Sequence, residues 1–236
     1  MSKTLVIFDI DGTLLFSNKE DSRIFARAFR KEFGFEAHSI DWHEFPHVTD
    51  TTILEVMFKK QGVPFPSVER LEEFKDYYVE MLLHRRVQNP ENFLQVEGAQ
   101  AAVHSLVADD RYLVGIATGG FRKPAFVKLD HVGINTESLF MSFADGNHTR
   151  EQIIEGVFRQ VETQGEAVSR SVYIGDAIWD VRTTRNMDLP FIGIQKPGKH
   201  DMLYRAGAKH VISDYKDYQG FLNLIENATP PLPQEP

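Results

Sequence analysis

The chain has 236 residues and not one cysteine, which excludes disulfide bridges, thiolate metal ligands and a cysteine nucleophile. Long hydrophobic runs are missing as well, since no stretch approaches the roughly 18 uninterrupted apolar residues of a membrane span. The first residues lead directly into an apolar segment and leave no room for a secretory signal. We therefore expect a soluble, cytoplasmic protein without a membrane partner, whose chemistry uses oxygen and nitrogen groups.

Positive charge is also scarce. Lysine and arginine together number 26 against 34 aspartates and glutamates, which gives a net charge of -8. This sign is wrong for a protein that wraps nucleic acid, so we expect no nucleic acid partner. The surplus of carboxylates also repels anionic substrates. A phosphate site would therefore need local positive charge, most simply from a metal ion.

What is present is a regular alternation of strand-like and helix-like segments. After the first apolar run, further runs of strand length lie at residues 112–117, 139–143, 172–174, 191–194 and 210–212. Between them, residues 98–108, 124–131 and 151–161 place apolar side chains three or four positions apart, as amphipathic helices do. Strands that alternate with helices are typical of an α/β fold with a parallel sheet.

One long stretch, residues 17–93, breaks this alternation. Asp50 is placed to cap one of its helices. Its helical patterns lie at 21–33, 51–61 and 68–86, and it shows no convincing buried strand. We therefore predict a core formed by residues 1–16 and 94–228, a helical insert formed by 17–93, and a proline-rich tail at 229–236.

The most informative segment is the first apolar run, which ends in Asp9 and Asp11 and is followed by a glycine. In open α/β sheets, chemistry collects where strands end. Residues two positions apart in extended backbone point the same way, so both carboxylates can face one site. Two close carboxylates repel unless a cation lies between them or one holds a proton, and either arrangement suits catalysis. Taken alone, the pair also fits ordinary turn or cap residues.

Three other predicted strand ends carry polar groups too. Thr118 and Gly119 offer a hydroxyl and an unobstructed N–H of the kind that cradles phosphate. Arg150 places a guanidinium near the start of a helix. Asp176 and Asp180 are neighbours if their segment is helical. Each feature has a plainer alternative, namely a glycine turn, a surface arginine and a pair of cap acids.

Together, the segment from Asp9 to Thr13, then Thr118, Arg150 and the aspartates at 176 and 180 resemble the four motifs of the haloacid dehalogenase superfamily, in order and in position. The resemblance covers nearly the whole chain. It implies a doubly wound, Rossmann-like parallel sheet, with residues 17–93 as a small helical cap between the first motif and the second strand. The most similar subgroup is that of phosphoglycolate phosphatase-like hydrolases.

The resemblance also implies roles in an Mg²⁺-dependent phosphatase that forms an aspartyl-phosphate. Asp9 would be the nucleophile that attacks phosphorus. Asp11 would be the acid that protonates the leaving oxygen and later activates water. The Mg²⁺ ligands would be the Asp9 carboxylate, the backbone carbonyl of Asp11 and Asp176, with Asp180 supporting them through water or hydrogen bonds.

The residues expected to bind the phosphoryl group depart from the usual pattern of the superfamily at the third motif, where lysine is usual. Arg150 keeps the positive charge there, although a guanidinium is larger and planar. By the resemblance, Thr118 and the N–H of Gly119 would hold phosphoryl oxygens, and Arg150 would neutralise their charge. Lys123 is a rival for that last role.

Asp11 favours phosphate chemistry, because cleavage of a carbon–halogen bond has no leaving oxygen to protonate. The expected partner is a small phosphorylated metabolite, either phosphoglycolate-like or a sugar phosphate, bound by a monomer or homodimer. A phosphomutase of the same superfamily would keep the same residues, and a binding protein can retain a fold without catalysis. A loop at 45–50 resembles the position of a specificity loop, where His47 or Thr49 would reach substrate.

Overall fold

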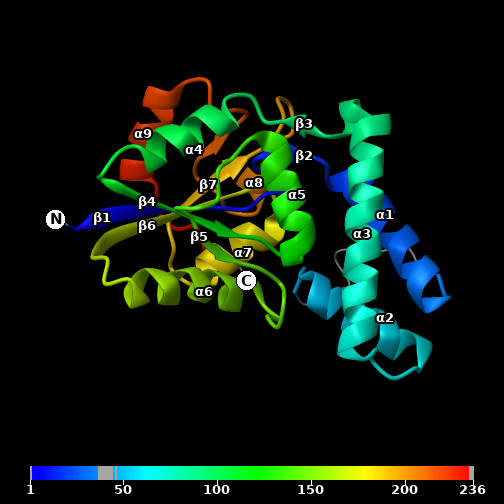
Figure 1. Cartoon of the computed structure of the whole chain (residues 1–236). Coiled ribbons are helices and arrows are strands. Elements are labelled where there is room, and N and C mark those ends of the chain that lie inside the picture. The colour runs from blue at the N-terminus through cyan, green and yellow to red at the C-terminus, as the bar shows by residue number, and fades with distance from the viewer. Residues whose placement is uncertain (1, 37–44, 46, 234–236) are drawn as a thin grey trace.

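The computed structural model describes residues 2–36, 45 and 47–233 and shows a layered α/β core beside a group of helices (Figure 1). Within these residues the core sheet is parallel throughout, with strand order β5-β4-β1-β6-β7-β8. Its strands are β1 (Lys3–Phe8), β4 (Tyr112–Ala117), β5 (Phe140–Ser142), β6 (Val168–Gly175), β7 (Phe191–Ile194) and β8 (Val211–Ile212). The predicted α/β class with a doubly wound parallel sheet is confirmed.

Helices cover both faces of this sheet, because its strands carry apolar side chains in both directions. In β1, Val6 and Phe8 pack on one face while Leu5 and Ile7 pack on the other, and all are almost completely buried. A strand buried on both faces reads as a continuous apolar run, which explains the sequence pattern. The first face is covered by α4 (Ala99–Val107), α5 (Arg122–Val132) and α9 (Tyr218–Asn227), and the second by α6 (Arg150–Thr163), α7 (Ile178–Asn186) and α8 (Asp201–Arg205).

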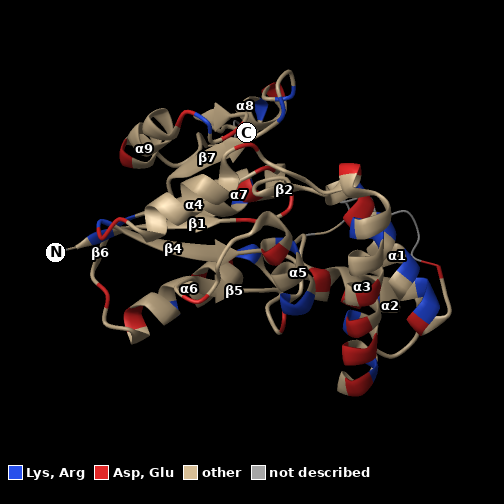
Figure 2. Ribbon diagram, turned by 45° about the horizontal axis from the view of Figure 1, so that its top comes forward, with Lys and Arg blue, Asp and Glu red and all other residues tan. Residues whose placement is uncertain are grey.

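The helical insert lies beside the core, away from the two sheet faces (Figure 1). Aromatic rings hold its helices together: Phe29 packs edge-on against Phe33 and Phe58, and Phe25 packs edge-on against Tyr78. Acidic and basic residues alternate in bands along its longest helix, α3 (Figure 2). The insert contains α1 (Asn18–Phe33), α2 (Asp50–Gln61), α3 (Val68–Gln88) and the short 3₁₀ helix η2 (Pro90–Asn92).

Two short strands join the insert to the core. They are β2 (Leu15–Phe16) and β3 (Leu94–Gln95), which pair antiparallel at the two points where the chain passes between core and insert. The two crossings therefore run side by side. Strands of two residues are too short to show an alternating pattern, so the sequence did not predict them.

The three helices predicted for the insert are present, although α1 starts at Asn18 and not at residue 21, and α3 extends to Gln88. The capping of α2 also differs from the expectation. Thr49, and not Asp50, is the N-cap of this helix, since the Thr49 hydroxyl accepts the N–H of Thr52. Asp50 is the first helical residue, which leaves its carboxylate available for contacts outside the helix. No helix among the described residues is both long and apolar enough to cross a membrane.

The described part of the proline-rich tail is bound to the core. The N–H of Phe191 donates to the Thr229 carbonyl, and the N–H of Leu232 donates to the Gly207 carbonyl. The guanidinium of Arg185 donates to the Leu232 carbonyl at 2.6 Å. These contacts fix the tail against α7, the start of β7 and the turn after α8.

Candidate active site

The polar residues singled out in the sequence meet at the carboxyl ends of three neighbouring strands. Asp9 follows β1, Thr118 follows β4 and Asp176 follows β6, and β1 lies between the other two strands in the sheet. A cavity of about 420 Å³ opens there. Its core wall includes Asp9, Asp11, Thr118, Gly119 and Arg150, and its insert wall includes Asp21, Val48, Asp50 and Ile53.

Asp9 lies at the floor of the cavity and is only 2% exposed. Its N–H donates to the Ile174 carbonyl of β6 at 2.9 Å, which fixes its backbone. One carboxylate oxygen, Oδ2, lies 3.5 Å from Nη1 of Arg150. The other, Oδ1, is buried without a hydrogen-bond partner among the described residues. Burial raises the pKa of Asp9, and the Arg150 guanidinium opposes that rise. Asp9 therefore has one oxygen free for a ligand.

Three carboxylates, with Asp9 among them, crowd together here. Asp9, Asp176 and Asp180 each offer an oxygen, and these oxygens lie within 4.8 Å of one another. Burial raises the pKa of Asp176 well above its ordinary value, and the charges of Asp180 and Asp9 raise it further. Burial likewise raises the pKa of Asp180, to about 7, despite the nearby Arg150. Such a cluster needs cations, and carboxylate oxygens suit Mg²⁺. This set of three carboxylates fits a metal ion there.

Asp180 supports this cluster from beneath and is only 1% exposed. Its Oδ2 accepts the N–H groups of Asp176 and Ala177, at 3.1 and 3.0 Å. Its Oδ1 lies 3.2 Å from Nη1 of Arg150. Both oxygens thus already have protein partners. Asp180 shapes the turn that carries Asp176 and orients the guanidinium beside it.

Arg150 enters the cavity from the first residue of α6. The helix starts in a capping box, in which Thr149 and Gln152 satisfy each other's backbone N–H groups. The guanidinium is buried and forked: Nε donates to the Val48 carbonyl at 3.0 Å, while Nη1 faces Asp9 and Asp180. Burial opposes its charge, yet these two carboxylates raise the pKa of Arg150 above its ordinary value. Only a planar fork makes these three contacts from one side chain.

Lys123, the rival for the same role, lies elsewhere. Its Nζ is 2.8 Å from Glu72 and 2.5 Å from Asp76, both on α3, and its side chain is 41% exposed. It therefore ties α5 to the insert on the outside of the molecule. Arg150, and not Lys123, lines the cavity.

Two glycines leave room for the site. Gly119, which follows Thr118, is closely packed. A Cβ added there would lie 2.5 Å from the Val48 carbonyl and 2.8 Å from the Arg150 guanidinium. Gly12 has a φ of 78°, and a side chain there would also clash, because a Cβ would lie 1.8 Å from Oδ2 of Asp176. Its turn and its close approach both require glycine.

Asp11 is held by residues that the sequence analysis did not identify. Its Oδ1 accepts the Ser17 hydroxyl at 2.7 Å, and its Oδ2 lies 2.7 Å from Nζ of Lys128. The same ammonium lies 2.9 Å from Oδ1 of Asp21 in α1. The sequence did carry a signal for Lys128. It stands three residues after Ala125 and four before Val132, on the apolar face of the predicted helix, where a charge is unexpected unless it is paired.

From the predicted specificity loop, Val48 and Asp50 line the cavity, whereas His47 and Thr49 make contacts elsewhere. Thr49 is fully buried, caps α2 and contacts the His148 carbonyl. His47 faces Glu151, with a nearest distance of 3.9 Å. Asp50 instead turns back to the core, where its Oδ2 accepts the N–H of Phe121 at 2.8 Å.

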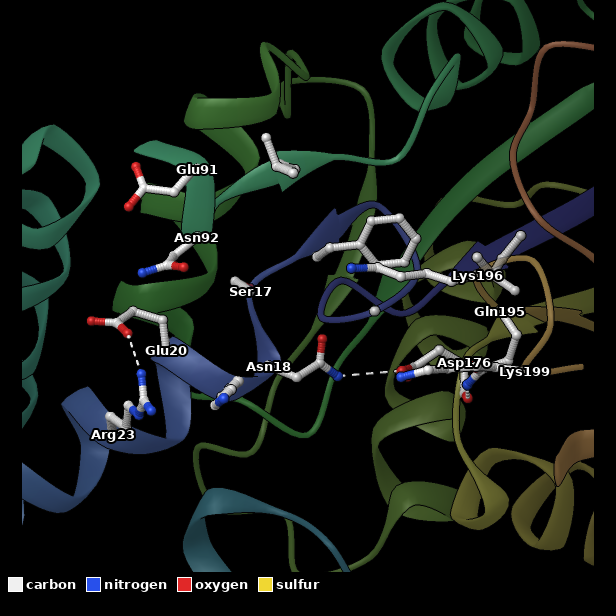
Figure 3. Close-up of a pocket in the computed structure, with 15 residues that line it drawn as sticks. Ser17, Asn18, Glu20, Arg23, Glu91, Asn92, Asp176, Gln195, Lys196 and Lys199 are labelled. Atoms are coloured by element: carbon white, nitrogen blue, oxygen red, sulfur yellow. Dashed lines mark hydrogen bonds and ion pairs between the residues drawn. The ribbon is translucent and has the colours of Figure 1, made fainter. Parts of the chain in front are cut away.

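A second cavity of about 400 Å³ adjoins the first and is lined by Asp176 (Figure 3). Asn18, at the start of α1, points to Asp176 and donates to its Oδ2 at 3.2 Å. On the far wall the ammonium of Lys196 lies over the Phe16 ring, 4.4 Å from its centre. Asn18 lines both cavities, so the insert closes the site on two sides.

Gly12→Ala tests whether the Asp176 carboxylate holds a metal. The new Cβ displaces that carboxylate, so we expect Mg²⁺ affinity, measured by calorimetric titration, to fall by more than about tenfold. Gly146→Ala is the matched control, because Gly146 also has a positive φ but an added Cβ meets nothing within 4 Å. Equal Mg²⁺ affinities for the two variants would contradict the assignment of Asp176.

Asp50 predicts a pH dependence of stability in the metal-free protein. Burial, with the charge of Asp21, raises the pKa of Asp50 from 3.8 to about 7. The folded protein thus keeps a proton that the unfolded chain releases, so stability falls as pH rises from 4 to 7. Asp50→Asn lacks this loss. Between pH 4 and pH 8, the free energy of unfolding of Asp50→Asn, measured by urea denaturation, should rise by on the order of 2–4 kcal/mol relative to that of the wild type.

The control for this experiment is Asp130→Asn, since the Asp130 side chain is 80% exposed. It should follow the wild-type profile. A constant difference between Asp50→Asn and the wild type at all pH values would contradict a raised pKa for Asp50.

Comparison with known proteins gives the family and the fold. Residues 6–194 match the family model described as haloacid dehalogenase-like hydrolase. No curated protein matches the chain. Among solved structures, a hydrolase from Pseudomonas syringae has 21% sequence identity and a TM-score of 0.70, with 96% of this chain and 100% of that chain covered.

Two further solved structures share the fold. A predicted phosphatase from Clostridium acetobutylicum has 18% identity and a TM-score of 0.60, covering 94% of this chain and 99% of that one. CbbY from Rhodobacter sphaeroides, in complex with phosphate, has 15% identity and a TM-score of 0.67, covering 91% and 95%. The matched region runs from within β1 to the end of β7 and includes every strand end that lines the site. The chain belongs to the family of haloacid dehalogenase-like hydrolases.

Proposed function

We propose that this hydrolase is an Mg²⁺-dependent phosphatase that cleaves a small phosphomonoester through an aspartyl-phosphate on Asp9. The observation that carries the proposal is the buried, unpartnered Oδ1 of Asp9, whose carboxylate clusters with Asp176 and Asp180 and contacts the guanidinium of Arg150 through Oδ2. A nucleophilic carboxylate needs a free oxygen and neighbouring positive charge to approach a phosphate dianion. Proteins with a similar fold include a predicted phosphatase and a protein solved in complex with phosphate, which agrees with this class.

In this reaction Asp9 Oδ1 attacks phosphorus, the bond from phosphorus to the leaving oxygen breaks, and Asp11 donates a proton to that oxygen. Asp11 then takes a proton from water as the water attacks phosphorus and releases Asp9. Arg150, the Thr118 hydroxyl and the N–H of Gly119 would hold the phosphoryl oxygens during both steps.

Asp9, the backbone carbonyl of Asp11 and Asp176 would hold the metal, with Asp180 behind them. A bound Mg²⁺ supplies positive charge to the phosphoryl group and to its nucleophile. Asn18 hydrogen-bonds Asp176 from the insert and limits where its carboxylate lies. Burial of the cluster keeps bulk water away from the phosphorylated aspartate.

A phosphomutase would use the same residues, and putative β-phosphoglucomutases are among the solved structures with this fold. The two activities differ in their product. A phosphatase releases free phosphate, whereas a mutase returns the phosphoryl group to a sugar. The products of sugar phosphates therefore decide between them.

The test measures phosphate release with Mg²⁺ from phosphoglycolate, sugar phosphates, nucleotides and p-nitrophenyl phosphate. We expect at least one small phosphomonoester to be hydrolysed, and Asp9→Asn to lower kcat by on the order of 10³-fold or more, because the nucleophile is lost. Removal of Mg²⁺ with a chelator should have an effect of similar size.

Asp110→Asn serves as the control, since Asp110 is an exposed carboxylate outside both cavities. It should keep wild-type activity. Phosphate release that persists unchanged in Asp9→Asn would show that the proposal is wrong. Isomerised sugar phosphate without free phosphate would replace the phosphatase with a mutase.

A further inference from the structure

Lys128 is a buried cation at the site to which the proposed reaction gives no role. Its side chain is 3% exposed and comes from α5, on the core side of the cavity. Burial disfavours its charge, but Asp11 and Asp21 raise the pKa of Lys128 above its ordinary value. An ammonium taken out of water at this depth is costly unless it is closely paired. Its two ion pairs are therefore the reason it can stay charged there.

The first pair fixes the carboxyl group of Asp11. Nζ of Lys128 lies 2.7 Å from Oδ2, while the Ser17 hydroxyl donates to Oδ1 at 2.7 Å. Each oxygen of Asp11 thus has its own donor, one from a core helix and one from the segment just before α1. Two donors on opposite oxygens set both the position and the rotation of a carboxyl group.

The second pair joins Lys128 to the insert. Asp21, on α1, lies 2.9 Å from Nζ and accepts the hydroxyl of Tyr78 on α3 at 2.6 Å. Lys128 and Asp11 belong to the core, whereas Asp21 and Tyr78 belong to the insert. One ammonium therefore links the expected acid to two helices of the insert, across the wall of the cavity.

We propose that Lys128 is a positioning residue for Asp11, and that Asp21 makes this positioning depend on the placement of the insert. The inference rests on the proposed function, in which Asp11 protonates the leaving oxygen. A general acid works only within hydrogen-bond reach of that oxygen. A misplacement on the order of 1 Å costs about 100-fold in rate. Loss of Lys128 should therefore lower the rate most for substrates whose leaving oxygen must be protonated.

The experiment compares two substrates that need the acid to different degrees. One is p-nitrophenyl phosphate, whose phenolate leaves without protonation. The other is the alkyl phosphate that the wild type hydrolyses best. Both substrates share the second step, in which Asp11 activates water, so the first step is measured alone, as release of the leaving group in a single turnover. For Lys128→Met we expect this rate to fall about 100-fold with the alkyl phosphate and less than about threefold with p-nitrophenyl phosphate. KM should change less than about threefold for both substrates, because the residues proposed to bind the phosphoryl group are unchanged.

Three further variants sharpen the test. Lys128→Arg keeps the charge and should stay within about tenfold of wild-type kcat on the alkyl phosphate. Asp21→Asn should show the same dependence on substrate with a smaller loss, since Lys128 still pairs with Asp11. Lys123→Met is the matched control on the same helix, because Lys123 pairs only with α3 on the outside; it should leave both rates unchanged.

Equal losses in the first step with both substrates would overturn the inference, because a merely structural lysine does not sense the leaving group. Unchanged rates in Lys128→Met would overturn it as well. A higher KM in Asp21→Asn without dependence on the leaving group would refute the role of the insert. Thermal melting checks that Lys128→Met folds, and if it does not, Lys128→Arg and Asp21→Asn carry the same comparison. If the wild type releases phosphate from neither substrate, the proposed function fails first, and the inference fails with it.

Discussion

The site depends on one electrostatic constraint: its carboxylates are buried close together and would repel one another without cations between them. Among the described residues, two buried cations relieve this repulsion in the same way. The Arg150 guanidinium lies 3.5 Å from Asp9 and 3.2 Å from Asp180. The Lys128 ammonium lies 2.7 Å from Asp11 and 2.9 Å from Asp21. Each buried cation thus lies between two acids, and the Oδ1 of Asp9 remains for a ligand. The net negative charge of the chain makes these local cations necessary.

The same contacts tie the helical insert to the core, so that the cavity belongs to both. Arg150 donates to the Val48 carbonyl, and the N–H of Phe121 donates to Asp50. Asn18 donates to Asp176 on the opposite side of the cavity. Beneath these contacts, β2 and β3 place the two chain crossings next to each other. A shift of the insert would therefore change the surroundings of residues on both the nucleophile side and the metal side of the site. This coupling gives a physical reason for an insert at this point of the chain.

Much of this arrangement could be predicted from local sequence pattern, and the remainder could not. Buried strands read as apolar runs, so β1 and the strand ends after it could be located, together with Asp9, Thr118 and Asp176. The partners of those residues are set by tertiary packing, which leaves little local pattern. Lys128 stands 117 positions from Asp11, and its only sequence signal is a charge on an apolar helix face. Thr49 and Asp50 show the limit at short range: both residues suit an N-cap, and only the fold decides that Thr49 fills it while Asp50 turns to Phe121.

The central claim is that Asp9 is the nucleophile and that it acts with a metal beside it. Beryllium fluoride tests this directly, because it binds a nucleophilic carboxylate as a mimic of an acyl phosphate and needs no knowledge of the substrate. We expect bound fluorine resonances by NMR for the wild type with Mg²⁺, and their loss when Mg²⁺ is removed or Asp9 is replaced by Asn. Bound resonances that persist in Asp9→Asn, or none in the Mg²⁺-loaded wild type, would contradict it.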